Sequence, residues 1–317
     1  MPRARIITAS TALAAVAVLG LTACGGATAD DTGVAVASGD PATCPGDVVD
    51  VVVSVGQWGD VVHSLAGACA TVTTIVASAA VDPHDFDPST ADLAAFSGAD
   101  LVVLNGAGYD HWAEDAAAAA DPRPAVVSAA DAADVPGEGE DPHLWYDPEA
   151  VQSTAAAVTE ELSRLSPDAA PYLGGQADAW RAALQPYLDA IDQLRRTVTA
   201  VGYTYVATET VFDRMARAVG LIDVTPPGYR RSASNESEPA PGDLSDFQAR
   251  LSDGLADVLI YNTQTRGSVP GQLRSAADQA DVPTVEVTES PADATGSFVA
   301  WQLGQLEALS EALGVDQ

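Results

Sequence analysis

Two blocks of this sequence alternate short β-branched runs with helical patterns, and about fifty residues with helical periodicity alone separate them. Strand candidates lie at 50–55, 71–76, 100–105 and 124–128, and again at 203–207, 222–224, 258–261 and 284–287. Such alternation is typical of α/β folds with a mostly parallel sheet. We therefore predict two α/β lobes, at 45–170 and 201–317, joined by a single long helix at 171–200. A ligand cleft between the lobes is the natural site in this layout.

The helical patterns refine this layout. One helix should begin at Asp147-Pro148, where Asp caps and Pro takes the first position, and end near 165. A long segment at 168–198 contains Pro186, which should kink or split it. Ser89 should cap a further helix. Other helices are expected at 212–219, 244–255, 269–279 and 297–313, and polar loops at 131–141 and 225–243.

The N-terminus predicts export. Arg3 and Arg5 precede an apolar run, at about 6–21, that ends in Leu-Thr-Ala-Cys. A basic start followed by a short apolar segment is typical of a secretory signal peptide, at 1–23, rather than of a membrane span. The ending resembles a bacterial lipobox, in which Cys24 becomes the lipidated first residue. Residues 24–44 would then form a flexible tether that holds the protein to the outer side of the cell membrane.

Two further cysteines, Cys44 and Cys69, each precede a strand candidate. With a crossover helix between them, the two parallel strands would start at the same end of the sheet and bring both thiols together. An exported compartment permits a disulfide there. Buried free thiols, or ligands to a soft metal, are the alternatives.

The charge of the chain excludes one class of partner. Its formal net charge is -31, with 45 Asp and Glu against 14 Arg and no Lys. Nucleic-acid phosphates would be repelled by such a protein. An acidic surface could concentrate cations, although charge spread over a whole chain acts weakly in salt. Solubility and residue usage are therefore the preferred explanation of the charge.

Two of the four histidines occupy nearly the same phrase. His84 lies in Asp-Pro-His-Asp-Phe-Asp-Pro and His143 in Asp-Pro-His-Leu-Trp-Tyr-Asp-Pro. A preceding proline stiffens the backbone, and neutral imidazole suits Zn, Mn, Fe, Co and Ni. The repetition predicts that both are metal ligands. His63, within a helix, and His111, beside Trp112, are weaker candidates.

These phrases, with the lipobox, resemble the substrate-binding lipoproteins of bacterial ABC importers for zinc or manganese. Further matching stretches cover nearly the whole chain after the lipobox: 54–58, 103–110, 236–239, 261–265 and 287–289. The resemblance implies two α/β lobes joined by one long helix. It also implies a monomer that captures a divalent metal and delivers it to a permease.

The resemblance also implies a ligand set. The family's first two ligands fall on His84 and His143. The third falls on Glu209, at the start of a helix that ends before Gly220-Leu221, and the fourth on Glu289, with Glu286 as its competitor. Two His and two carboxylates favour Mn more than an all-His site would, yet the affinity order favours Zn. The transported metal stays open between Zn, Mn and Fe.

Two other functions compete. A secreted metal-dependent hydrolase would need an open coordination position for water, which four protein ligands do not leave. The sequence contains no His-Glu-x-x-His motif. We therefore expect a binding protein rather than an enzyme. An adhesin or an organic-ligand binding protein of the same fold is the other alternative.

Overall fold

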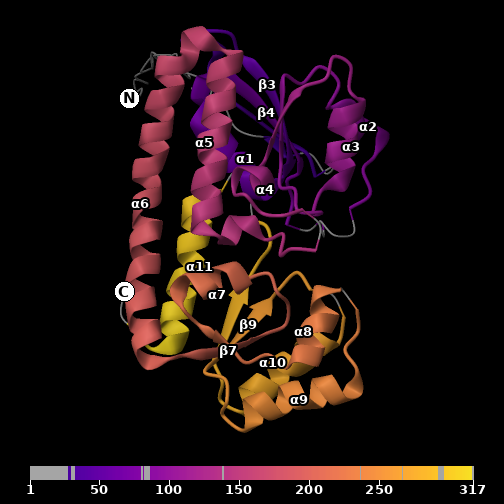
Figure 1. The fold of residues 1–317 in the computed structure, drawn as a ribbon, viewed down its shortest axis with the longest axis vertical. Helices are drawn as coiled ribbons and strands as arrows, with labels where there is room; N and C mark the ends of the chain where they lie inside the picture. Colours follow the sequence, from indigo (N-terminus) through magenta and orange to yellow (C-terminus); the bar gives the residue numbers. More distant parts are fainter. Residues whose placement is uncertain are drawn as a thin grey trace, which may run out of the picture.

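The computed structural model describes residues 33–79, 81, 86–137, 139–235, 237–265, 267–291 and 296–315, together with the backbone of 28–29. Two sheets with flanking helices lie at opposite ends of the molecule, and α6 (Ala170–Val201) runs along one side of both (Figure 1). We call the two parts the N-terminal and C-terminal lobes. The described part of the chain has the predicted α/β class.

The sheet of the N-terminal lobe has six strands in the order β1-β2-β4-β3-β5-β6. Their bounds are β1 (Thr28–Ala29), β2 (Ala35–Ser38), β3 (Val49–Val55), β4 (Ala70–Val76), β5 (Leu101–Leu104) and β6 (Ala125–Ser128). Strands β3 to β6 are parallel to one another, as predicted. The tether expectation is wrong for 35–38, because β2 pairs antiparallel with β4 and belongs to the sheet.

The helices of this lobe are α1 (Gly56–Ala66), α2 (Thr90–Ala94), α3 (His111–Ala119), α4 (Ala129–Ala132) and α5 (Pro148–Leu165). Helix α1 is the predicted crossover between β3 and β4, and it packs against β4, α5 and α6. Asp147 caps α5 by accepting hydrogen bonds from two backbone N–H groups, with Pro148 at the first position. Ser89 caps α2. Both caps are confirmed.

Cys44 and Cys69 form a disulfide with their Cα atoms 5.0 Å apart. Cys44 precedes β3, and Cys69 is the last residue of a short 3-10 helix that precedes β4. The bond therefore lies at the amino ends of the parallel strands. The residues that follow the carboxyl ends of β3 and β5 lie at the other end of the sheet.

The sheet of the C-terminal lobe is wholly parallel, in the order β10-β9-β7-β8. Its strands are β7 (Thr204–Ala207), β8 (Ile222–Asp223), β9 (Val258–Asn262) and β10 (Thr284–Val287). Its helices are α7 (Asp213–Val219), α8 (Pro227–Ser234), α9 (Pro241–Ser252), α10 (Val269–Gln279) and α11 (Phe298–Leu313). The polar loop predicted at 225–243 contains α8, of which Tyr229 alone is buried. A helix with one buried residue gives too little hydrophobic periodicity to be recognised.

Pro186 was expected to kink or split this segment, and α6 runs through it as one continuous helix, so the split does not occur. Leu184 and Tyr187 on either side of the proline are fully buried, so both halves of the helix are held by core packing. The last helix, α11, packs against α6, α1 and β10 and therefore contacts both lobes (Figure 1). The backbone N–H of Phe298 donates to Asp60 of α1 at 2.8 Å.

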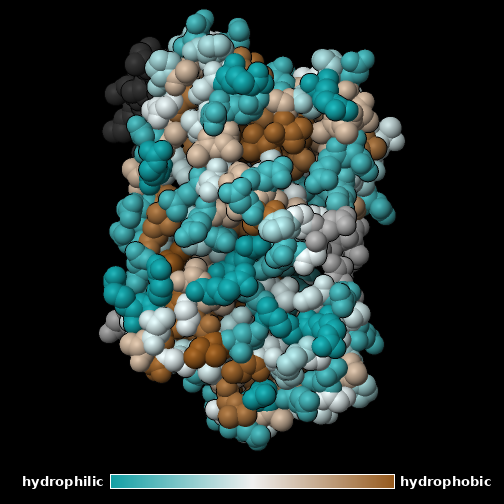
Figure 2. All heavy atoms as spheres, viewed as in Figure 1, coloured by the Kyte–Doolittle hydropathy of each residue, from teal (hydrophilic) through white to brown (hydrophobic). Residues whose placement is uncertain are grey.

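Hydrophilic residues cover most of the face shown in Figure 2, consistent with the acidic composition. Within the part of the chain that the structure describes, no helix combines the length and the apolar character needed to cross a membrane. Residues 1–27, with the predicted signal peptide and Cys24, lie outside that part.

Candidate metal site

His143 lies in the loop before a short 3-10 helix (Leu144–Tyr146) and is 6% exposed. Its Nδ1 lies 2.7 Å from Oδ1 of Asp141, which also accepts the His143 backbone N–H at 3.1 Å. Burial opposes ionisation of Asp141, but hydrogen bonds from His143 and the charge of Arg214 lower its pKa. Because Nδ1 faces this carboxylate, Nε2 is the nitrogen that would bind a metal.

The His143 loop is supported by residues at the carboxyl ends of β3 and β5. Asn105 donates through its side-chain amide to the carbonyl of Pro142 at 2.9 Å. Trp58 in turn donates to the Asn105 side chain at 3.1 Å. The buried carboxylate of Asp110 accepts from Ser54 and from the backbone N–H of Asn105. These contacts give a structural role to stretches 54–58 and 103–110, to which sequence analysis assigned none.

Glu209 lies in the turn between β7 and α7. It was predicted to start a helix, but α7 begins only at Asp213. Its Oε2 accepts a hydrogen bond from the side-chain amide of Asn262 at 2.5 Å. Burial, and after it the charge of Glu289, raise the pKa of Glu209, although the amide of Asn262 and the nearby His143 favour its ionised form.

Glu289 follows β10 and is 4% exposed. Its Oε1 accepts from the same Asn262 amide at 2.9 Å, and its Oε2 accepts from the hydroxyl of Tyr109 at 3.1 Å. The competitor Glu286 is half-exposed on β10 and forms an ion pair with Arg274 at 2.7 Å. The structure therefore places Glu289, and not Glu286, beside Glu209.

The side chains of Asn262 and Tyr109 hold the two carboxylates of the described part of the site through hydrogen bonds. Asn262 donates to Glu209 and Glu289, while Tyr109 joins Glu289 to the opposite lobe. The ring of Tyr109 also contacts those of His143 and Trp145, with centroids 6.3 and 5.1 Å apart. Asn262 and Tyr109 lie within stretches 261–265 and 103–110, which match the family, but no role was predicted for them. Their positions, Asn262 at the end of β9 and Tyr109 after β5, were the available signal.

His84 lies outside the described residues, so the structure does not test its position. Among the residues that are described, no three or more His, Cys, Asp or Glu side chains form a metal-binding group. His63 is part of α1 and half-buried, and His111 lies at the start of α3, 3.2 Å from Glu114.

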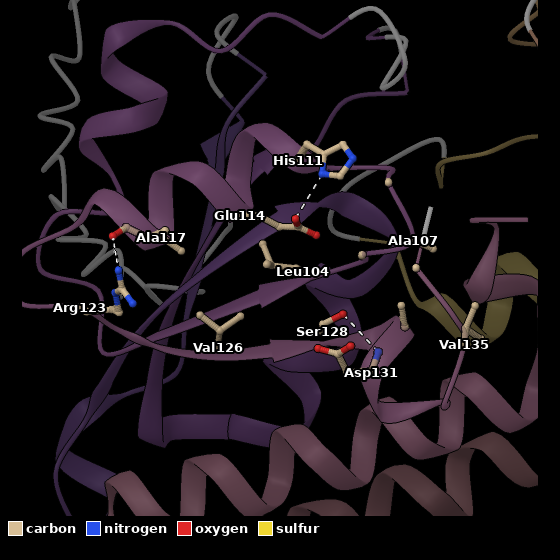
Figure 3. Close-up of a pocket in the computed structure, with 15 residues that line it drawn as sticks. Leu104, Ala107, His111, Glu114, Ala117, Arg123, Val126, Ser128, Asp131 and Val135 are labelled. Carbon is tan, nitrogen blue, oxygen red and sulfur yellow. Dashed lines mark hydrogen bonds and ion pairs between the residues drawn. The ribbon is translucent and has the colours of Figure 1, made fainter. Parts of the chain in front are cut away.

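Two hollows open near these residues. The first, of about 530 Å³, lies between the lobes and is lined by His143, Tyr109 and Glu209, among others. The second, of about 510 Å³, lies between α3 and β6 in the N-terminal lobe. Figure 3 shows His111 and Glu114 at one side of it and Ser128 and Asp131 at the other. Of the four predicted ligands, His143 and Glu209 line the inter-lobe hollow.

A family model described as the periplasmic component A of the zinc-uptake complex matches residues 51–312. The chain belongs to this family. Members of the zinc-uptake component A family are binding proteins associated with transporters, and the resemblance stated from the sequence is confirmed.

Two curated relatives have low sequence identity to this chain. The chain is 28% identical over 203 residues to the manganese-binding lipoprotein MntA of Halalkalibacterium halodurans, covering 63% of this chain and 66% of the relative. It is 25% identical over 215 residues to the high-affinity zinc uptake system protein ZnuA of Bacillus subtilis, covering 62% and 65%. The matches thus span just under two thirds of these relatives' own lengths.

Solved structures show the same fold. The periplasmic zinc-binding protein TroA of Treponema pallidum superposes with a TM-score of 0.71 at 20% identity, covering 84% of this chain and 99% of that one. The binding protein FpvC of Pseudomonas aeruginosa, solved with Mn²⁺, gives 0.69 at 20% identity, with 84% and 98% covered. The two-lobed architecture is therefore that of periplasmic metal-binding proteins.

Proposed function

We propose that this chain is an extracytoplasmic protein that captures Zn²⁺ or Mn²⁺ between its lobes and delivers it to the permease of an ABC importer. The carrying observation is that Asn262 holds two largely buried carboxylates, Glu209 and Glu289, side by side. Two neighbouring carboxylates repel each other in a poorly hydrated site. A divalent cation bound between them would remove that repulsion.

The remaining ligands of the proposed site are His143 and His84. The carbonyl of Ala79, a few residues before His84, accepts from the side chain of Gln264 at 2.9 Å. The same Gln264 accepts the backbone N–H of Glu289 at 2.6 Å. The segment that leads into the His84 phrase is therefore anchored next to Glu289. This anchoring supports a site with two ligands from each lobe.

Four protein ligands leave no position for a reactive water, which supports a binding protein rather than a hydrolase. The names of the relatives include zinc and manganese transport proteins, and several of these are lipoproteins. We extend this to the present chain: residues 1–23 direct export, and acylated Cys24 holds the mature monomer at the membrane. Titration with each ion distinguishes Zn²⁺ from Mn²⁺.

The test is metal binding by the purified protein after removal of metal with a chelator. Zn²⁺ and Mn²⁺ are titrated by calorimetry, and thermal unfolding is followed with and without metal. A ligand at a hundred times its Kd stabilises a protein by about 2.7 kcal/mol. We expect such stabilisation with at least one of the two ions, and its loss in H84A and H143A. Wild-type protein that responds to neither ion would refute the proposal.

A further inference from the structure

Arg214, on α7 of the C-terminal lobe, reaches into the N-terminal lobe. Its side chain is 9% exposed. Its Nε and Nη2 donate to the backbone carbonyl of Asp141 at 3.1 and 2.5 Å, and its Nη1 donates to Oδ2 of Asp147 at 3.2 Å. Its Nε also lies 3.6 Å from Oδ2 of Asp141. One guanidinium therefore spans two aspartates on either side of His143.

Asp141 transmits this contact to the candidate ligand. While Oδ2 faces Arg214, Oδ1 lies 2.7 Å from Nδ1 of His143. A ligating imidazole is commonly oriented by a carboxylate on its other nitrogen, and loss of that partner weakens metal binding. Arg214 in turn fixes this carboxylate, because a planar guanidinium holds its partners in a defined geometry.

Helix α7 and the segment after His143 also pack against each other. Helix α7 packs against the 3-10 helix that follows His143. Phe212, which precedes α7, contacts the ring of Tyr146 with centroids 5.2 Å apart. The turn that carries Glu209 leads directly into this segment. His143 and Glu209 thus come from different lobes, but the contacts of Arg214 and the packing of α7 hold the segments that carry them together.

We propose that Arg214 is a positioning residue for metal capture. It connects the two lobes through Asp141 and Asp147. It thereby holds His143 with Nδ1 toward Asp141 and Nε2 toward the metal. This role rests on the proposed function, since it requires His143 to be a ligand. The proposal predicts that the ring of His143 is already oriented before metal binds.

The test compares R214M with R217M, using Zn²⁺ as the probe. Arg217 is 61% exposed and lies 3.5 Å from the same Oδ2 of Asp141, which makes it a matched control. We expect R214M to bind Zn²⁺ about 10–100-fold more weakly. R217M should change the affinity by no more than about twofold, as for an exposed ion pair. Circular dichroism and thermal unfolding check that both variants are folded.

A second readout separates positioning from stability. Long-range ¹H–¹⁵N spectra of the histidine rings, assigned with H143Q, report which nitrogen of His143 carries the proton. Metal-free wild type should show one tautomer, and R214M a mixture. R214K replaces R214M in these measurements if R214M does not fold. Lysine keeps the charge but cannot bridge both aspartates, so R214K should also bind Zn²⁺ more weakly and show a mixture of tautomers.

Wild-type Zn²⁺ affinity and an unchanged tautomer in a folded Arg214 variant would overturn the role of Arg214 and leave the proposed function intact. Wild-type protein that binds neither Zn²⁺ nor Mn²⁺ would overturn both.

Discussion

The hydroxyl of Tyr109 donates a hydrogen bond to Oε2 of Glu289 at 3.1 Å, and the two residues come from opposite lobes. Burial, and after it the charge and hydrogen bond of Glu289, raise the pKa of Tyr109 well above its usual value. The phenol therefore stays protonated and remains a donor at neutral pH. This bond fixes the carboxylate across the cleft while the ring packs against Trp145.

Replacement of Tyr109 by Phe should weaken metal binding without unfolding the protein. The ring and its packing remain, but Glu289 loses one of its donors. Hydrogen bonds to charged groups contribute about 1.5–3 kcal/mol, so we expect a loss of that order in binding free energy. Calorimetric titration with Zn²⁺ and Mn²⁺ measures it. An unchanged affinity would show that the bond does not position Glu289.

Glu289 and Glu286 can be separated as ligands. E289Q should abolish tight metal binding, because it removes a buried carboxylate from the site. E286Q is the control, since Glu286 is half-exposed and pairs with Arg274. It should leave the affinity unchanged. Competition with a chromogenic chelator ranks the two variants, and a stronger effect of E286Q would reverse our assignment.

Asn262 should stabilise the metal-free protein. In N262A, Glu209 and Glu289 lose their shared donor, and the cost of an unpaired buried group is about 1–3 kcal/mol or more. Urea unfolding in the presence of a chelator should show this loss. Saturating metal should reduce it, because the cation replaces the amide in screening the two carboxylates. Equal losses with and without metal would contradict this account.

The disulfide should contribute stability and leave metal binding unaffected. It closes a loop across a sequence separation of 25 residues, which predicts about 3 kcal/mol by loop entropy. The C44S/C69S variant should lose that amount in denaturant unfolding. Its metal affinity should match wild type, since the bond lies at the end of the sheet away from His143. A large drop in affinity would link the two ends.

Asp60 gives a pH-dependent test of the α1–α11 contact. Burial raises its pKa despite the hydrogen bond from Phe298, so its charge destabilises the folded state at neutral pH. Between the ordinary carboxyl pKa and the raised one, the folded protein binds more protons than the unfolded one, so this cost disappears as the pH falls through that interval. D60N keeps an acceptor for Phe298. It should be more stable than wild type at pH 7, with a gap that closes toward acid pH.

The sequence by itself determined the class of fold. The β-branched runs and the caps at Ser89 and Asp147 are local signals, because hydrophobic period and capping depend on neighbouring residues. The strands of both sheets, except β1 and β2, appear where these signals put them. The paired Asp-Pro-His phrases also indicated metal chemistry, and family membership agrees with it.

Tertiary structure decided what local signals could not. Helix α6 continues through Pro186 because buried neighbours hold it, and β2 joins the sheet because β4 offers a free edge. Neither the bridge from Asn262 to Glu209 and Glu289 nor the reach of Arg214 to Asp141 has a local sequence signature. Each joins residues 27 to 73 positions apart, which only folding brings within hydrogen-bonding distance.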